Sequence, residues 1–210
     1  MQDPGTETRA AAAQSRIGVS EGRRTVRGMT RYAALLRGIA PSNPNMTNDK
    51  LRAVFEGLGF AKVSSVLASG NIVFGADESD VVVLENRIQQ ALHAELGIGG
   101  ATIVRSHAEL RALLDSDPFP GLTHARSTYL TATFLKDGAR SDPGMQSAPE
   151  GPGTHIVGYD PVARVFLAVI DNSEQGKASS FMGWLERTYG KDITTRTWLT
   201  VQRIVARLEL

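Results

Sequence analysis

From Thr30 onward, apolar residues recur at spacings that predict a regular succession of strands and helices. Helical spacing ends at Gly59 and at Gly97, where a glycine can take the left-handed conformation that closes a helix. Ser69 and Gly70 separate two strand-like runs and predict a hairpin turn. In order, the predicted segments are a strand at 32–36, a helix at 51–58, strands at 63–68 and 71–74, a helix at 81–96 and a strand at 101–105.

This β-α-β-β-α-β order predicts a ferredoxin-like α+β fold. In that plan the first two strands run in the same direction, because a helix connects them, and the hairpin then reverses the chain. We therefore expect three loops at one edge of the sheet. They are the loop that begins at Arg37, the Ser69–Gly70 turn and the glycine-rich loop at 97–100.

The rest of the chain predicts a second α+β unit. Ser106 and Glu109 form a capping box at the start of a helix, and Thr197 is the expected N-cap of a closing helix. Between them, the pattern predicts strands at 128–135, 156–159 and 165–170 and a helix at 181–189. This unit resembles an altered copy of the first. The predicted division is residues 1–28, then a ferredoxin-like subdomain at 29–105, then a second α+β subdomain at 106–210.

Residues 1–28 are rich in alanine, glycine and arginine and show no apolar periodicity, so we expect a disordered extension. They hold five arginines against three acidic residues, a balance of +2. The whole chain carries +1, so the remainder is −1 and has no overall basic character. A nucleic-acid-binding domain usually has a marked positive excess, so the charge disfavours that function.

Arg37 is the first candidate for binding chemistry, because it leaves a buried strand at the predicted loop edge. Its guanidinium suits a carboxylate or a phosphate, although a structural ion pair would explain it equally well. Gly38 would allow a positive φ or a close ligand approach. At the same edge, Ser69, Gly70 and Asn71 could bind a ligand or could simply be the residues that a tight turn favours.

A second candidate lies before the closing helix, where Thr195 and Arg196 place a hydroxyl and a guanidinium at a helix start that attracts anions. The alternative is an ordinary capped helix with Trp198 in the core. Lys177 could add charge to a neighbouring pocket, but its surroundings do not match a phosphate-binding loop, which needs a serine or threonine where Ala178 stands.

Other chemistries lack a signal in the sequence. The chain has no cysteine, which removes disulfides and thiolate sites and suits a reducing cytoplasm. The four histidines show no ligand spacing, so we expect no metal and no cofactor, and no triad pattern nominates a catalytic residue. No apolar run approaches the roughly 20 residues that span a bilayer, so we expect no membrane partner.

Five segments together resemble the bacterial family known as domain of unknown function 1697. They are YAALLRGI at 32–39, LGF at 58–60, SGNIVF at 69–74, DPFP at 117–120 and TTRTWLTV at 194–201. The resemblance implies a duplicated ferredoxin-like fold in a cytoplasmic bacterial protein, and it implies no catalytic residue. Two positions depart from the family pattern: the loop after Ile39 lacks the usual valine and paired glycines, and Thr197 replaces the usual asparagine.

The leading hypothesis is a non-catalytic protein that binds a small anionic or phosphate-bearing ligand. Arg37 and Arg196 would supply charge, and Ser69 and Asn71 would supply hydrogen bonds. One alternative is nucleic-acid binding on a ferredoxin-like sheet, which needs exposed aromatic residues on the strands. Another is an enzyme with an unrecognised site, in which Asp171 or Glu174 would act beside the arginines.

Overall fold

The structure is a computed structural model that describes residues 28–125, 127–138, 153–171 and 180–210. The predicted extension at 1–28 therefore lies almost wholly outside the described residues. In the first half of the chain the elements are β1 (Thr30–Leu36), α1 (Asn48–Gly57), β2 (Ala61–Ser65), β3 (Asn71–Ala76), α2 (Val81–Leu96), β4 (Thr102–Ser106) and α3 (His107–Asp115). In the second half they are β5 (Tyr129–Leu135), β6 (Thr154–Asp160), β7 (Val165–Ile170), α4 (Ser180–Tyr189), β8 (Ile193–Thr197) and α5 (Trp198–Leu208).

The strands form two four-stranded antiparallel sheets, which confirms the α+β class. The first sheet has the order β2-β3-β1-β4, and the second has the matching order β6-β7-β5-β8. β1 and β5 are thus the equivalent inner strands, and β4 and β8 are equivalent edges. The ferredoxin-like description of each half, and the duplication, remain interpretations that these matching orders support.

The sequence pattern located most elements but missed β8. The capping box of Ser106 and Glu109 and the N-cap role of Thr197 are confirmed, as is the left-handed cap at Gly97. The expectation that the threonines before Trp198 sit in a helix start is wrong for all but Thr197, because Ile193–Thr197 pair with β5 as a strand. A short run of threonines gives β8 too little apolar content for a pattern to find.

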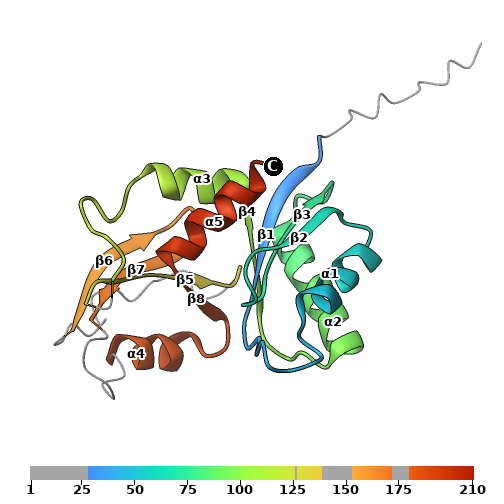
Figure 1. The fold of residues 1–210 in the computed structure, drawn as a ribbon, viewed down its shortest axis with the longest axis horizontal. Coiled ribbons are helices and arrows are strands. Elements are labelled where there is room, and N and C mark those ends of the chain that lie inside the picture. The colour runs from blue at the N-terminus through green and yellow to red at the C-terminus, as the bar shows by residue number, and fades with distance from the viewer. Residues whose placement is uncertain (1–27, 126, 139–152, 172–179) are drawn as a thin grey trace, which may run out of the picture.

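The helices cover the sheets from three sides (Figure 1). α1 and α2 pack on one face of the first sheet, and α4 packs on the corresponding face of the second. α3 and α5 lie together between the sheets, where α5 contacts β1 and β3 of the first sheet and β5 and β8 of the second. The central core draws on both halves, so neither half has a fully separate interior. The predicted boundary at residue 105 stays a prediction.

The three loops meet at one edge of the first sheet, as expected from the order of its elements. The Leu36 amide donates to Gly70 O at 2.8 Å, and the Arg37 amide donates to Ala101 O at 2.9 Å. Gly70 has φ +73°, and a Cβ on it would lie 2.5 Å from the Ile39 side chain. Glycine at position 70 is therefore needed both for its backbone conformation and for the close approach.

Gly100 makes an even closer approach, which leads to a testable prediction. A Cβ on this residue would lie 2.0 Å from the backbone oxygen of Arg37. Gly100→Ala should lower the free energy of unfolding by about 1–3 kcal/mol, because the backbone must shift to relieve the overlap. Gly99→Ala is the matched control, since a Cβ there meets nothing within 4 Å, and it should change stability by less than about 0.5 kcal/mol. Urea unfolding of both variants measures the difference, and equal effects would contradict the prediction.

Candidate functional site

Arg196 lies in β8, and its guanidinium crosses from the second half to the loop edge of the first. Its Nε donates to Asn71 Oδ1 at 2.5 Å, and its Nη1 donates to Thr194 Oγ1 at 2.7 Å and to Thr195 O at 2.9 Å. Its Nη2 donates to Leu36 O at 2.8 Å and lies 3.4 Å from both Ser69 O and Gly70 O. All are neutral oxygens. Among the described residues, Arg196 has no ion pair, and burial lowers its pKa to about 10.

Asn71 is sealed inside the protein and does not open to solvent. Its side chain is fully buried, its amide nitrogen donates to Val66 O and to Ser69 Oγ at 3.0 Å each, and its oxygen accepts from Arg196. The sequence pattern singled out Asn71 and Arg196, and the structure brings them together. In this arrangement Asn71 positions Arg196, and its buried side chain is not accessible to a ligand from solution.

Arg37 lies beside Arg196 and reaches in the opposite direction, from the first half to the second. Its Nη1 donates to Ile193 O at 3.0 Å, and its Nη2 pairs with Glu186 Oε1 on α4 at 3.0 Å. The Arg37 side chain is 29% exposed and the Glu186 side chain is 60% exposed. The Leu36 carbonyl that binds Arg196 belongs to the peptide bond that leads into Arg37, so both cations lie at one junction. We call this junction the Arg196 seam: Leu36–Gly38, Ser69–Asn71, Glu186 and Ile193–Arg196.

The other described seam between the halves is its structural counterpart. Arg105 lies opposite Ala33 in the β1–β4 pairing, as Arg196 lies opposite Ala132 in the β5–β8 pairing, and each immediately precedes a helix N-cap. Arg105 Nε donates to Ala163 O at 2.6 Å, and its Nη2 donates to Leu135 O at the end of β5. Each arginine therefore binds the last carbonyl of the inner strand in the opposite half.

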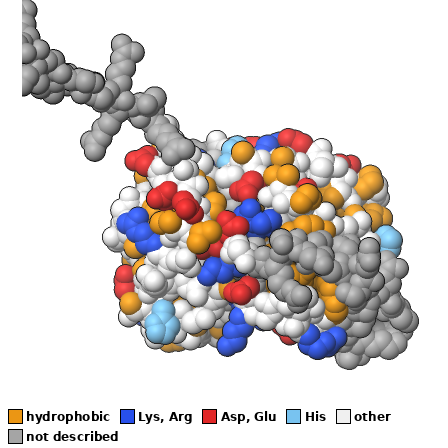
Figure 2. Space-filling view, turned by 180° about the vertical axis from the view of Figure 1, so that it is seen from behind, with side chains coloured by type: hydrophobic (Ala, Val, Ile, Leu, Met, Phe, Trp, Pro, Cys, Tyr) orange, Lys and Arg blue, Asp and Glu red, His pale blue; other side chains and the backbone are white. Residues whose placement is uncertain are grey.

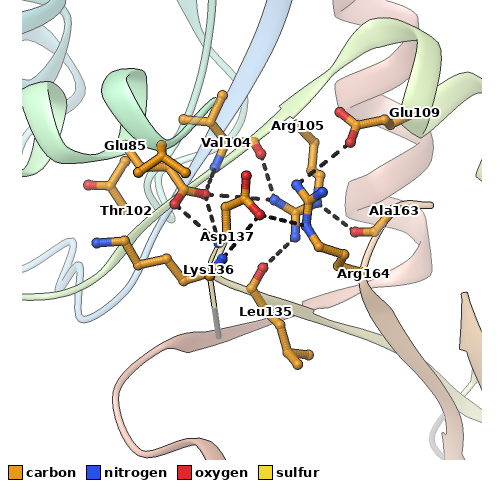
Figure 3. Close-up of polar contacts among 12 residues, drawn as sticks. Glu85, Thr102, Val104, Arg105, Glu109, Leu135, Lys136, Asp137, Ala163 and Arg164 are labelled. Atoms are coloured by element: carbon orange, nitrogen blue, oxygen red, sulfur yellow. Dashed lines mark hydrogen bonds and ion pairs between the residues drawn. The ribbon is translucent and has the colours of Figure 1, made fainter. Parts of the chain in front are cut away.

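We call this counterpart the Arg105 seam, and it contains several carboxylates beside the arginines (Figure 3). Its residues are Glu85, Arg105, Glu109, Leu135–Asp137, Ala163 and Arg164. Glu85 and Arg105 have fully buried side chains, with Oε1 and Nη1 3.8 Å apart. Arg164 has Glu109 and Asp137 each at 3.7 Å. The sequence pattern did not single out Glu85 because it stands among the apolar positions of α2, where a carboxylate gives no visible signal.

Burial governs the electrostatics of the Arg105 seam. It raises the pKa of Glu85 to about 7, although the Val104 amide and the Arg105 guanidinium both favour the ionised carboxylate. Burial also lowers the pKa of Arg105 to about 10, helped by the neighbouring charge of Arg164. The Arg105 seam thus holds acidic and basic groups in similar number, whereas the Arg196 seam has two guanidinium groups and, among the described residues, the single carboxylate of Glu186.

Two further predicted site residues are Thr195 and Lys177. The Thr195 hydroxyl is 2.8 Å from the Thr133 hydroxyl and is used within the second sheet. Lys177 lies outside the described residues.

Among the described residues, no group of three histidine, aspartate or glutamate side chains could hold a metal ion. In the same part of the chain, no helix is long and apolar enough to cross a membrane.

Comparison with known proteins gives a family but no activity. The family model described as protein of unknown function (DUF1697) matches residues 29–152, more than half of the chain. The chain belongs to this family. No curated protein matches it. A solved structure of the conserved bacterial protein SP0830 from Streptococcus pneumoniae is similar, with a TM-score of 0.67 and 22% identity over 87% of this chain and 99% of that one. This likeness shows a shared fold.

The raised pKa of Glu85 predicts a pH dependence of stability that this family member should show. The ordinary pKa of the group is 4.5, so between pH 4.5 and about 7 the folded chain binds more protons at Glu85 than the unfolded chain. The contribution of Glu85 to stability therefore falls as the pH rises through this window. Relative to Glu85→Gln, the wild type should lose stability from pH 5 to pH 8 in urea unfolding. Glu95→Gln, an exposed position on the same helix, is the control, and a Glu85→Gln difference independent of pH would refute the prediction.

Proposed function

We propose that this protein binds a small anionic ligand, a carboxylate or a phosphate, at the Arg196 seam. The observation that carries the proposal is that the Arg37 guanidinium is partly open to solvent and has, among the described residues, a single, weakly held carboxylate partner. Its guanidinium is partly exposed, and its carboxylate partner Glu186 is a largely exposed side chain held by one bond of 3.0 Å. A planar guanidinium in such a place suits an oxyanion from solution. Arg37 is the residue we assign to ligand contact.

The energetics allow a ligand to replace Glu186. An exposed ion pair contributes only about 0–1 kcal/mol, so its loss costs little. Arg196 adds a positive charge with no carboxylate of its own among the described residues, and burial strengthens the attraction of that charge for an anion. In this proposal Asn71, Ser69 and Gly70 hold Arg196 in place. Lys177 remains a proposed source of further charge, and a bacterial cytoplasm remains the proposed location.

The alternatives gain less support. Nucleic-acid binding on a sheet needs exposed aromatic residues, and Tyr32 and Phe74 are buried. On the face shown in Figure 2, the basic side chains of the described residues are interspersed with acidic ones, an arrangement that does not favour a phosphate backbone.

The enzyme alternative depended on a carboxylate placed beside the arginines. Asp171 lines a small hollow together with Ser127 and His155, and none of the arginines that the structure describes lines it. Glu174 lies outside the described residues. Among the described residues, Glu186 is the carboxylate that pairs with an arginine of the Arg196 seam, and the proposal for this seam is binding without catalysis.

A thermal-shift screen of the full chain against carboxylate and phosphate metabolites tests the proposal. A ligand at 100 times its dissociation constant stabilises by about 2.7 kcal/mol, which for a chain of this size raises Tm by about 5–10 °C. We expect that shift to be lost in Arg37→Met, which keeps the length of the side chain but removes the guanidinium. It should grow in Glu186→Gln, because the competing carboxylate is gone.

Lys136→Met is the matched control, since Lys136 is the residue equivalent to Arg37 at the Arg105 seam. The Lys136 amide bonds to Asp192 O as the Arg37 amide bonds to Ala101 O, and the Lys136 side chain binds Gln89 at 2.9 Å. Its ligand response should match the wild type. If every anion that stabilises the wild type stabilises Arg37→Met equally, or if none stabilises the wild type, the proposed function is wrong.

A further inference from the structure

The edge strand β4 shows how this fold binds a carboxylate. The amides of Thr102 and Val104 point away from β1, and two side chains of α2 accept from them. Glu85 Oε1 accepts from Val104 N at 3.0 Å, and Gln89 Oε1 accepts from Thr102 N at 3.4 Å. Glu85 Oε2 also accepts from Asp137 N of the second half at 3.2 Å. One carboxylate thus joins an edge strand of one half to the chain that leaves the inner strand of the other (Figure 3).

The equivalent amides at the other seam are Thr195 and Gly38. Lys136 N donates to Asp192 O, so Lys136 and Asp192 form a hydrogen-bonded pair between β5 and β8. Hydrogen-bonded and non-hydrogen-bonded pairs alternate along an antiparallel ladder. The Thr133–Thr195 pair is therefore non-hydrogen-bonded, and its backbone amides point away from the partner strand. Thr195 N therefore points away from β5, as Val104 N points away from β1. Gly38 follows Arg37 as Asp137 follows Lys136. Within the described ranges, neither Thr195 N nor Gly38 N has a hydrogen-bond partner, and Gly38 is exposed.

The positive charges at the two seams also correspond. Arg105 Nη1 donates to Val104 O at 2.6 Å and faces Glu85 at 3.8 Å. Arg196 Nη1 donates in the same way to Thr195 O at 2.9 Å. Arg37 stands in the place of Lys136, whose charge favours the ionised form of Glu85. The Arg196 seam therefore repeats the donors and the cations that surround Glu85.

Among the described residues, the Arg196 seam has no carboxylate in the place that Glu85 takes at the Arg105 seam, because Glu186 pairs with Arg37 instead. Glu85 stands twelve residues before Gly97, the glycine that ends α2, and the same spacing before Gly190, which follows α4, falls on Ala178. Ala178 lies outside the described residues, and its side chain has no carboxylate. Val104 and Arg105 are fully buried, whereas Thr195 and Arg196 are only partly buried. Among the described residues, the equivalent position thus has the same donors, no carboxylate that accepts from them, and greater access to solvent.

We propose that the carboxylate of a small-molecule ligand binds the Arg196 seam in the position that the Glu85 carboxylate occupies at the Arg105 seam. Its oxygens accept from the amides of Thr195 and Gly38, and Arg196 and Arg37 neutralise its charge. This inference rests on the proposed function and narrows the ligand class from anions in general to carboxylates. It also explains why a ligand must compete with Glu186, which uses one donor of the same arginine.

Amide NMR spectra of the full chain titrated with sodium acetate test this inference, with sodium chloride at equal ionic strength as the reference. We expect saturable downfield shifts of the Thr195 and Gly38 amide protons, because a bound carboxylate withdraws electron density from each donor. The amides of Val104 and Asp137 are internal controls that should not move, because Glu85 already occupies them. A second titration uses inorganic phosphate.

The outcomes separate this inference from the proposed function. If phosphate moves Thr195 and Gly38 and acetate does not, the carboxylate assignment is wrong and anion binding stands. If neither probe moves them while the thermal-shift response still depends on Arg37, the position is wrong and the proposed function stands. Thr195→Pro removes the outward amide at an edge position where proline is tolerated and should abolish the acetate response at Gly38, whereas Thr195→Val keeps the amide and should retain it. Retention in a folded Thr195→Pro protein would overturn the inference.

Discussion

Two arginines at equivalent positions hold the halves of this protein together, each by donating to backbone oxygens at the end of the other half's inner strand. Arg105 binds the Leu135 carbonyl and Arg196 binds the Leu36 carbonyl. A strand end presents carbonyls that no ladder satisfies, and a buried guanidinium needs several acceptors, so each group meets the other's requirement. This constraint fixes the register of one sheet against the other, and with it the positions of Arg37 and Glu85.

The two seams then differ in how the positive charge is balanced. At the Arg105 seam, Glu85 supplies a buried carboxylate that also closes the exposed edge of β4. At the Arg196 seam, among the described residues, only neutral oxygens accept hydrogen bonds from the Arg196 guanidinium. A buried ion pair is costly to assemble, and removing one of its partners is more costly still, so the Glu85–Arg105 pair holds the Arg105 seam in one arrangement. The second retains an unbalanced charge beside a partly exposed arginine, and that imbalance is the physical basis of the function proposed for it.

Much of this arrangement could be predicted from local signals. Element order alone brought Arg37, Gly70 and the 97–100 loop to one sheet edge, because strand direction follows from the connections. Glu85 and β8 gave no such signal. A single carboxylate among apolar helix positions does not stand out in the sequence, and a run of threonines before Trp198 resembles the start of a helix. The contact of Arg196 with Asn71 joins residues 125 positions apart in different halves, and only the docking of the two sheets determines it.

The measurement that tests this account most directly compares the free energies of unfolding of Arg105→Met and Arg196→Met, each with and without Glu85→Gln. Arg105→Met leaves Glu85 buried and unpaired and should cost about 3–5 kcal/mol. Arg196→Met leaves neutral acceptors, as far as the described residues go, and should cost about 1–3 kcal/mol. Adding Glu85→Gln should recover part of the loss in the Arg105 background and none in the Arg196 background. Equal costs for the two arginines, or the same effect of Glu85→Gln in both backgrounds, would contradict the account.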